Sequence, residues 1–189
     1  MIHPSPRRVH GASRPGRHDD HAPADGTTPA VRSLVDVLLA RLDDSFDRPA
    51  AVDTLAAVGS GPGRAWTWGG LIASAVATAE RLEAAGLRRG DRLAHLGRHS
   101  VEWIVIDLAC LLSGVVHVAL HPDSTRSTWI GQLRWLGVDG FVVSGGRRPP
   151  AAGDLPPRTP LIDPGAVLVS GSSPDQATLR SAVGQRAAL

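Results

Sequence analysis

The chain has 189 residues, 42% of them hydrophobic and 20% charged, a composition typical of one globular domain with or without a tail. All 20 basic side chains are arginines, and the sequence contains no lysine, tyrosine or asparagine. These residues therefore hold no P-loop lysine, Schiff-base lysine or kinase strand lysine. The single cysteine, Cys110, excludes a disulfide scaffold and a cysteine-based zinc site. A net charge of +2 does not suggest nucleic-acid binding.

Residues 1–30 predict a disordered tail, because they hold five prolines, four histidines and four arginines and almost no large apolar side chains. Within it, His18 and His21 flank Asp19 and Asp20, a pattern that a metal site could also show. A metal site needs a fixed surrounding shell, so we favour solvated polar side chains. We assign no metal ligands.

No membrane span is predicted. The most apolar stretch, residues 104–120, contains Asp107 and His117, whereas a spanning helix needs about 20 nearly uncharged residues. Arg7 and Arg8 are not followed by an apolar segment, so we expect neither a Sec nor a twin-arginine signal. The expected location is the cytoplasm.

The folded domain is predicted over residues 31–145. Apolar residues at helical spacing predict a first helix that begins after Ser33. Short strands are predicted at residues 50–52 and 65–68, on either side of a glycine-rich loop. A longer apolar helix then follows and ends at Gly86, a typical stop residue.

The centre of the chain alternates strands and helices at short spacing. Ser100 is expected to cap one helix, Gly114 to end it and Gly137 to end the next. Short connections of this kind predict parallel βαβ units, and continuous apolar strands predict a sheet covered on both faces. The predicted fold class is therefore α/β. The expected strands cover residues 91–96, 115–120 and 141–143, and the helix between the first two runs to about residue 113.

After residue 145 the pattern weakens. Residues 146–189 predict a linker rich in proline and glycine, followed by a degenerate and loosely attached carboxyl-terminal segment. Within it, residues 166–169 are a candidate strand and residues 176–189 a weakly patterned candidate helix. The segment from Ser144 to Arg148 could cradle a phosphate, but two prolines follow it and favour a linker.

Four histidines, His95, His99, His117 and His121, flank the predicted strands. His99 and His121 would lie just past the carboxyl ends of strands, where open α/β sheets bind ligands. Such histidines fit a general base or ligand contact, or ordinary packed and loop side chains. The second interpretation is favoured because the sequence places no carboxylate or cysteine partner beside them.

Several segments resemble the amino-terminal region of adenylate-forming enzymes, the superfamily of acyl-CoA synthetases, adenylation domains and luciferases. Residues 87–103 read LRRGDRLAHLGRHSVEW, similar to the family's G-D-R-V-A strand and its N-S-x-E-W helix start. Residues 109–122 read ACLLSGVVHVALHP, similar to A-x-L-x-x-G-A-V-x-V-P-L-x-P, with Ala119 at the family's proline. Residues 67–71 and 136–143 resemble its T-[YW]-x-E-L and D-S-G-A-x-V-L-V segments.

The resemblance implies the amino-terminal subdomain of a fold that activates a carboxylate with ATP and transfers it to a thiol, with ATP, magnesium and coenzyme A as partners. The family's phosphate loop reads roughly [ST]-S-G-T-T-G-x-P-K-G. Ser170, Gly171, Ser172 and Ser173 match its S-G-T-T core, but Pro174 replaces the next glycine and no lysine follows. A vestigial phosphate loop and a chance Gly/Ser loop both remain open here.

These observations favour a truncated or degenerate AMP-dependent synthetase or ligase that is inactive as an isolated chain, without catalytic residues of its own. The alternative is a non-catalytic interaction module, or one half of a split adenylating enzyme. In either alternative, a second protein chain would complete the fold. We expect the helices that carry Trp103 and Trp129 to offer it an exposed apolar surface. For the two tryptophans themselves, their place in apolar helical stripes favours core or interface packing.

Overall fold

The computed structural model describes most of the predicted domain and part of the segment that follows it. The predicted tail over residues 1–30 and the candidate strand over residues 166–169 lie outside the described residues. None of the helices in the described part combines the length and the apolar character needed to cross a membrane. The described residues are 33–53, 64–145, 148, 150–163 and 174–187.

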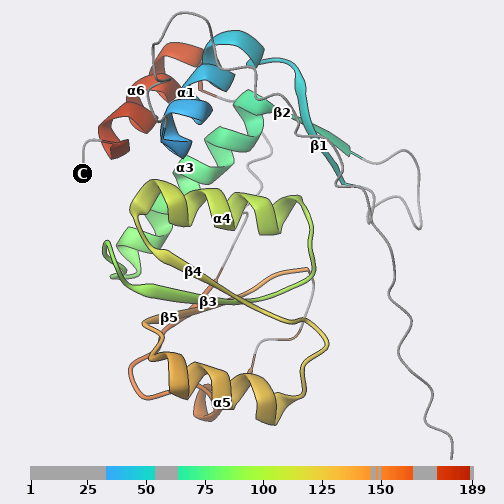
Figure 1. The fold of residues 1–189 in the computed structure, drawn as a ribbon, viewed down its shortest axis with the longest axis vertical. Coiled ribbons are helices and arrows are strands. Elements are labelled where there is room, and N and C mark those ends of the chain that lie inside the picture. Colours follow the sequence, from blue (N-terminus) through green and yellow to red (C-terminus); the bar gives the residue numbers. More distant parts are fainter. Residues whose placement is uncertain (1–32, 54–63, 146–147, 149, 164–173, 188–189) are drawn as a thin grey trace, which may run out of the picture. The chain divides into compact units, whose positions relative to one another are not determined.

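Helices and strands alternate through the centre of the chain, as the sequence predicts (Figure 1). In chain order the elements are α1 (Leu34–Ser45), β1 (Pro49–Asp53), β2 (Arg64–Thr67), α3 (Trp68–Ala84), β3 (Arg92–Leu96), α4 (Val101–Ser113), β4 (Val116–Leu120), α5 (Arg126–Leu136), β5 (Gly140–Val143), the short 3-10 helix η1 (Ala152–Asp154), β6 (Leu161–Ile162) and α6 (Gln176–Ala187).

A four-stranded parallel sheet in the order β4-β3-β5-β6 forms the centre of the fold. β3 lies between two partners, so Leu96 is opposite Leu120 of β4 and opposite Val143 of β5. Helix α4 covers one face of the sheet and α5 covers the other (Figure 1). This arrangement confirms the predicted α/β class with parallel βαβ units. β1 and β2 form a separate antiparallel pair.

Helix ends fall where side chains or glycines satisfy the backbone. The Ser33 hydroxyl accepts a hydrogen bond from the Asp36 N–H, and the Asp36 carboxylate accepts one from the Ser33 N–H. The Ser100 hydroxyl accepts from the Trp103 N–H at the start of α4. Gly114 ends α4 with φ +67°, a conformation that costs little only for glycine. The boundaries predicted at Ser33, Ser100 and Gly114 are confirmed.

The sheet separates two apolar clusters, and alternate side chains of β3 enter each of them. Leu93 packs in the cluster beneath α3 and α4, whereas Leu96 packs in the cluster beneath α5. In the second cluster Trp129 stacks on Phe141 with ring centroids 5.7 Å apart. Trp129 is therefore part of the core, as its place in an apolar helical stripe predicts. The exposed tryptophan of α5 is Trp135, at 85%.

The described elements of the carboxyl-terminal part, β6 and α6, are packed against the domain, and for them the prediction of a loosely attached segment over residues 146–189 is corrected. β6 extends the parallel sheet by pairing with β5. Helix α6 contributes Leu179 and Val183 to the core beneath α3 and α4. Its Gln176 side chain donates to the Leu42 carbonyl of α1 at 2.7 Å. The few apolar positions of α6 are a weak signal by themselves, and they become informative only where α1 and α3 cover them.

We expect the Leu179→Ala variant to lose about 2–5 kcal/mol of unfolding free energy, because it deletes most of a fully packed side chain. Urea denaturation followed by tryptophan fluorescence measures this loss. The matched control is Leu34→Ala on α1, where the side chain is 66% exposed and the change should stay within about 0.5 kcal/mol. Equal, small losses in both variants would show that α6 is not anchored.

Candidate functional site

Four polar side chains form a continuous hydrogen-bonded chain between α4 and the sheet. The Ser144 hydroxyl lies 2.7 Å from Nε2 of His95, and Nδ1 of His95 lies 3.0 Å from Nε2 of His117. Nδ1 of His117 in turn lies 2.7 Å from Oδ1 of Asp107. Ser144 is 3% exposed and Asp107 50% exposed, so the chain runs from the interior to the surface. We call these four residues the polar chain.

The strand register explains why these side chains meet. His117 of β4 is paired with Leu93, two residues before His95, so both histidines point to the face of the sheet that α4 covers. On the other side His95 is paired with Val142, and Ser144 follows two residues later on the same face. β3 and β4 thus supply one histidine each, and the serine is the residue just beyond β5.

Aromatic rings enclose the two central histidines. Trp103 of α4 stacks on His95 with ring centroids 6.0 Å apart and an interplanar angle of 24°. The same indole ring lies 5.0 Å from His117 and 4.9 Å from His99. Since Asp107 follows Trp103 by four residues, both side chains lie on one face of α4. This face supplies the charged end of the polar chain and its apolar wall.

The hydrogen-bond geometry assigns the protons when both imidazoles are neutral. A carboxylate only accepts, so His117 donates to Asp107 from Nδ1 and accepts at Nε2 from His95. His95 then accepts at its own Nε2 from the Ser144 hydroxyl. Burial and, to a smaller extent, the neighbouring His117 together lower the pKa of His95 to about 3. His95 therefore stays neutral near pH 7.

Close backbone packing holds the buried end of the polar chain. A Cβ on Gly97 would overlap the Ser144 hydroxyl and approach Nε2 of His95 to 2.9 Å. The Glu102 carboxylate of α4 accepts the N–H of Gly145 at 2.9 Å, which ties the loop after β5 to the same helix. The arrangement can orient one buried hydroxyl.

The structure brings together only some of the predicted site residues. His95 and His117 bond to each other, and His99 reaches them through Trp103. His121 lies apart, where its Nδ1 accepts the Asp123 N–H within a turn. The sequence analysis did not predict either end of the polar chain: Asp107 was not proposed as a site residue, and Ser144 was named only within a possible phosphate cradle. The available signal for Asp107 was a carboxylate in the middle of a mainly apolar helix, whose other acidic residue, Glu102, lies in the first turn.

The predicted phosphate-loop residues Ser170, Gly171, Ser172 and Ser173 lie outside the described residues. Pro174, which is described, follows them directly and precedes α6. Among the side chains that the structure describes, no three histidine, cysteine or acidic residues gather in a way that could hold a metal ion. We therefore assign no magnesium ligands and derive no step through that ion.

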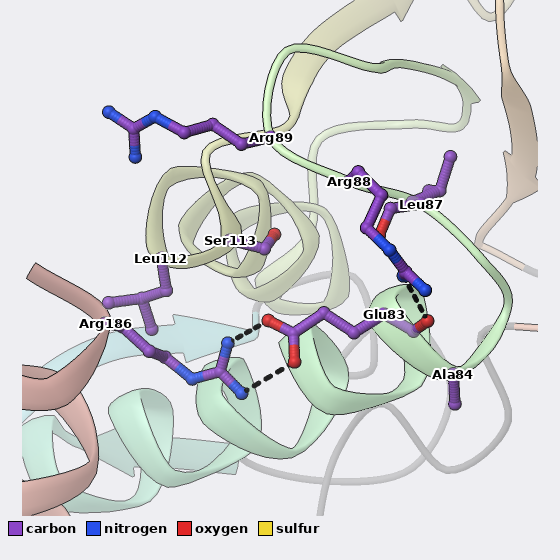
Figure 2. Close-up of a pocket in the computed structure, with 8 residues that line it drawn as sticks. All are labelled: Glu83, Ala84, Leu87, Arg88, Arg89, Leu112, Ser113 and Arg186. Carbon is purple, nitrogen blue, oxygen red and sulfur yellow. Dashed lines mark hydrogen bonds and ion pairs between the residues drawn. The ribbon is translucent and has the colours of Figure 1, made fainter. Parts of the chain in front are cut away.

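A cavity of about 620 Å³ lies near the amino-terminal ends of β3 and β4, away from the end of the sheet where Ser144 lies (Figure 2). Arg88 donates to the carbonyls of Glu83 and Leu87, each at 2.9 Å, and so satisfies groups at the end of α3. Arg186 pairs with the Glu83 carboxylate, and Arg89 points away from it (Figure 2). Arg88 and Arg186 have structural partners, and parallel sheets bind ligands at the carboxyl-terminal ends of their strands, on the opposite side of the sheet. We assign no site here.

Comparison with known proteins gives the family. A sequence profile described as AMP-binding enzyme matches residues 41–182, about three quarters of the chain. The chain belongs to the AMP-binding enzyme family. The match begins within α1, spans the whole parallel sheet and extends into α6. It therefore includes most of the part that the sequence analysis assigned to a linker and a degenerate carboxyl-terminal segment.

Individual relatives show how much of the family's length is present. The mitochondrial medium-chain acyl-CoA ligase ACSF2 of Rattus norvegicus is 38% identical over 64 residues, which are 34% of this chain and 10% of that protein. O-succinylbenzoate CoA synthetase of Bacillus subtilis, solved with ATP and a magnesium ion, is 21% identical with a TM-score of 0.58. The alignment covers 73% of this chain and 34% of that one. The protein CmiS6 is 25% identical, with a TM-score of 0.61 and coverages of 74% and 35%.

Because His95 is buried, the unfolding free energy is expected to depend on pH in a way that can be measured. His95 has a folded pKa of about 3 against 6.5 for an ordinary histidine, so between these values the unfolded state binds the extra proton. Stability is therefore complete above pH 6.5 and falls as the pH drops toward 3. The loss attributable to His95 is at most about 1.4 kcal/mol per pH unit. Urea unfolding at pH 7, 6, 5 and 4 measures it.

A His95→Gln variant keeps a neutral polar side chain at every pH, so its unfolding free energy should fall less steeply on acidification than that of the parent chain. The control is His121→Gln, where the ring lies outside the polar chain and the pH profile should match the parent. Parallel profiles for all three proteins would contradict the assignment of His95 as a buried neutral base.

Proposed function

We propose that this chain supplies the first part of an adenylate-forming enzyme fold, whose reaction activates a carboxylate with ATP and passes the acyl group to a thiol such as coenzyme A. The observation that carries the proposal is the family match over residues 41–182. The names of two relatives support it, since one is an acyl-CoA ligase and the other a CoA synthetase solved with ATP and magnesium.

We further propose that these 189 residues do not form acyl-adenylates by themselves. They contain no lysine, and positioned charge is usually the largest contribution to this kind of catalysis. Pro174 stands where the family's loop has a glycine, and proline has no N–H to donate to a phosphate. The chain also spans only about a third of the length of the solved structures that it matches.

The expected result is no ATP–pyrophosphate exchange above background for the isolated chain with a panel of aliphatic, aromatic and amino carboxylic acids. The physical reason is the lack of charge to stabilise the phosphates as the pyrophosphate leaves. A parallel calorimetric titration should give no saturable ATP binding at millimolar concentration. Several charge-assisted contacts are lost together, and each is worth about 1.5–3 kcal/mol.

Two outcomes would contradict this proposal. Exchange activity with any acid would show that the chain is catalytic alone. Saturable ATP binding that the Gly171→Pro variant abolishes would assign Ser170, Gly171, Ser172 and Ser173 as a working phosphate loop. The matched control is Gly153→Pro in η1, outside the proposed loop. It separates loss of the loop from a general effect of proline.

A second candidate function is a non-catalytic module, or half of a split enzyme, that pairs with another protein chain. The observation that favours it is apolar surface on three separate elements of the described fold. Val52 of β1, Val116 of the edge strand β4 and Trp135 of α5 are all exposed. An edge strand with exposed apolar side chains commonly requires cover in a soluble protein.

Size-exclusion chromatography with light scattering, combined with binding of an apolar fluorescent dye, tests this second function. We expect strong dye fluorescence from the isolated chain, and a Trp135→Glu, Val116→Thr double variant should reduce that fluorescence without unfolding. A monomer that binds no dye would contradict the proposal. So would dye binding that the double variant leaves unchanged.

A further inference from the structure

A groove of about 420 Å³ lies between α1 and α4, beside the start of β4. Its walls are apolar apart from the outer end of the polar chain. Leu38 and Val115 are buried, whereas Leu34 and Val37 of α1 are exposed. A concave, mainly apolar site of this size with few polar groups has the usual character of a small-molecule site. The lining residues are Leu34, Val37, Leu38, Asp107, Leu108, Cys110, Leu111, Val115 and His117.

The groove has a single permanent charge, the Asp107 carboxylate. Its other titratable lining groups are the Cys110 thiol and the His117 ring. Burial and, to a smaller extent, the charge of Asp107 together raise the pKa of Cys110 to about 12, so the thiol stays protonated. No arginine is among the lining residues. A ligand that enters the groove therefore meets an apolar surface and one carboxylate, whose Oδ1 is bonded to His117.

The polar chain sets how Asp107 meets a ligand. Oδ1 accepts from Nδ1 of His117, and that ring is held in place by its second bond to His95. The carboxylate is half-exposed, and its second oxygen can accept from a donor in the groove. A cationic donor there adds a charge-assisted hydrogen bond, whereas an anionic ligand is repelled.

We propose that this groove binds a small amphiphilic cation, with an alkyl chain lying between α1 and α4 and an ammonium group on Asp107. The occupant is chosen by charge complementarity, since the lining offers one anion and otherwise apolar walls. The inference rests on the described lining residues alone and does not depend on the proposed adenylation reaction.

Three ligands with the same alkyl chain test the charge preference by isothermal titration calorimetry on the full chain. We expect octylammonium to bind more tightly than octanol, and octanol more tightly than octanoate. The Asp107→Asn variant keeps an oxygen that accepts from His117 but removes the charge. It should weaken octylammonium about fivefold, the upper range for a partly exposed ion pair, and should not weaken octanol. The control Asp123→Asn removes an exposed carboxylate on the turn after β4 and should change nothing.

A second variant tests the groove without touching the polar chain. Val37→Trp places a large ring at the exposed rim and should abolish binding of all three ligands. Its matched control is Val52→Trp on β1, another exposed valine, which should bind like the parent.

Four outcomes would overturn the inference. One is no binding of octylammonium, and another is equal affinity for the three ligands. A third is unchanged binding in both the Asp107→Asn and Val37→Trp variants. The fourth is a dimer in light scattering that Val37→Trp dissociates, because a second copy of the chain would then be the occupant.

Discussion

The pairing of β3 with β4 on one side and β5 on the other is the interaction on which the described fold depends. It places one buried strand between two helical layers, so its side chains alternate between two apolar clusters. The same register carries His95 to the α4 face beside His117 and leaves Ser144 at the end of the neighbouring strand. Core packing and the polar chain therefore have one common cause.

A buried chain of polar groups is costly unless every member has a partner, because each group gives up water. Here the bonds from Ser144 to Asp107 are continuous, and the charged end lies at the surface where it stays hydrated. Removing either histidine ring would leave two hydrogen-bonding partners unsatisfied at once. The polar chain therefore holds α4 in one position on the sheet. The same hydrogen bonds hold the Asp107 carboxylate in place where it lines the groove beside α1.

In the described part of this chain the basic side chains are all arginines, and several of them form structural hydrogen bonds and ion pairs. Arg88 satisfies helix-end carbonyls, whereas Arg126 and Arg180 pair with carboxylates of other elements. The planar guanidinium forms such forked contacts well, but it does not replace the compact charge of a lysine beside a phosphate. Because the chain has arginines but no lysine, we propose that it forms one part of an AMP-binding enzyme fold and needs further residues for adenylation.

The sequence alone determined the α/β class, the family resemblance and the helix boundaries at Ser33 and Gly114, because periodicity and capping act over a few residues. Only the tertiary structure decided that α6 packs on α1. It also decided which histidines meet a serine and a carboxylate. His95 and His117 are 22 residues apart, and His95 and Ser144 are 49 apart. Contacts over such separations depend on strand register, which short-range patterns do not encode.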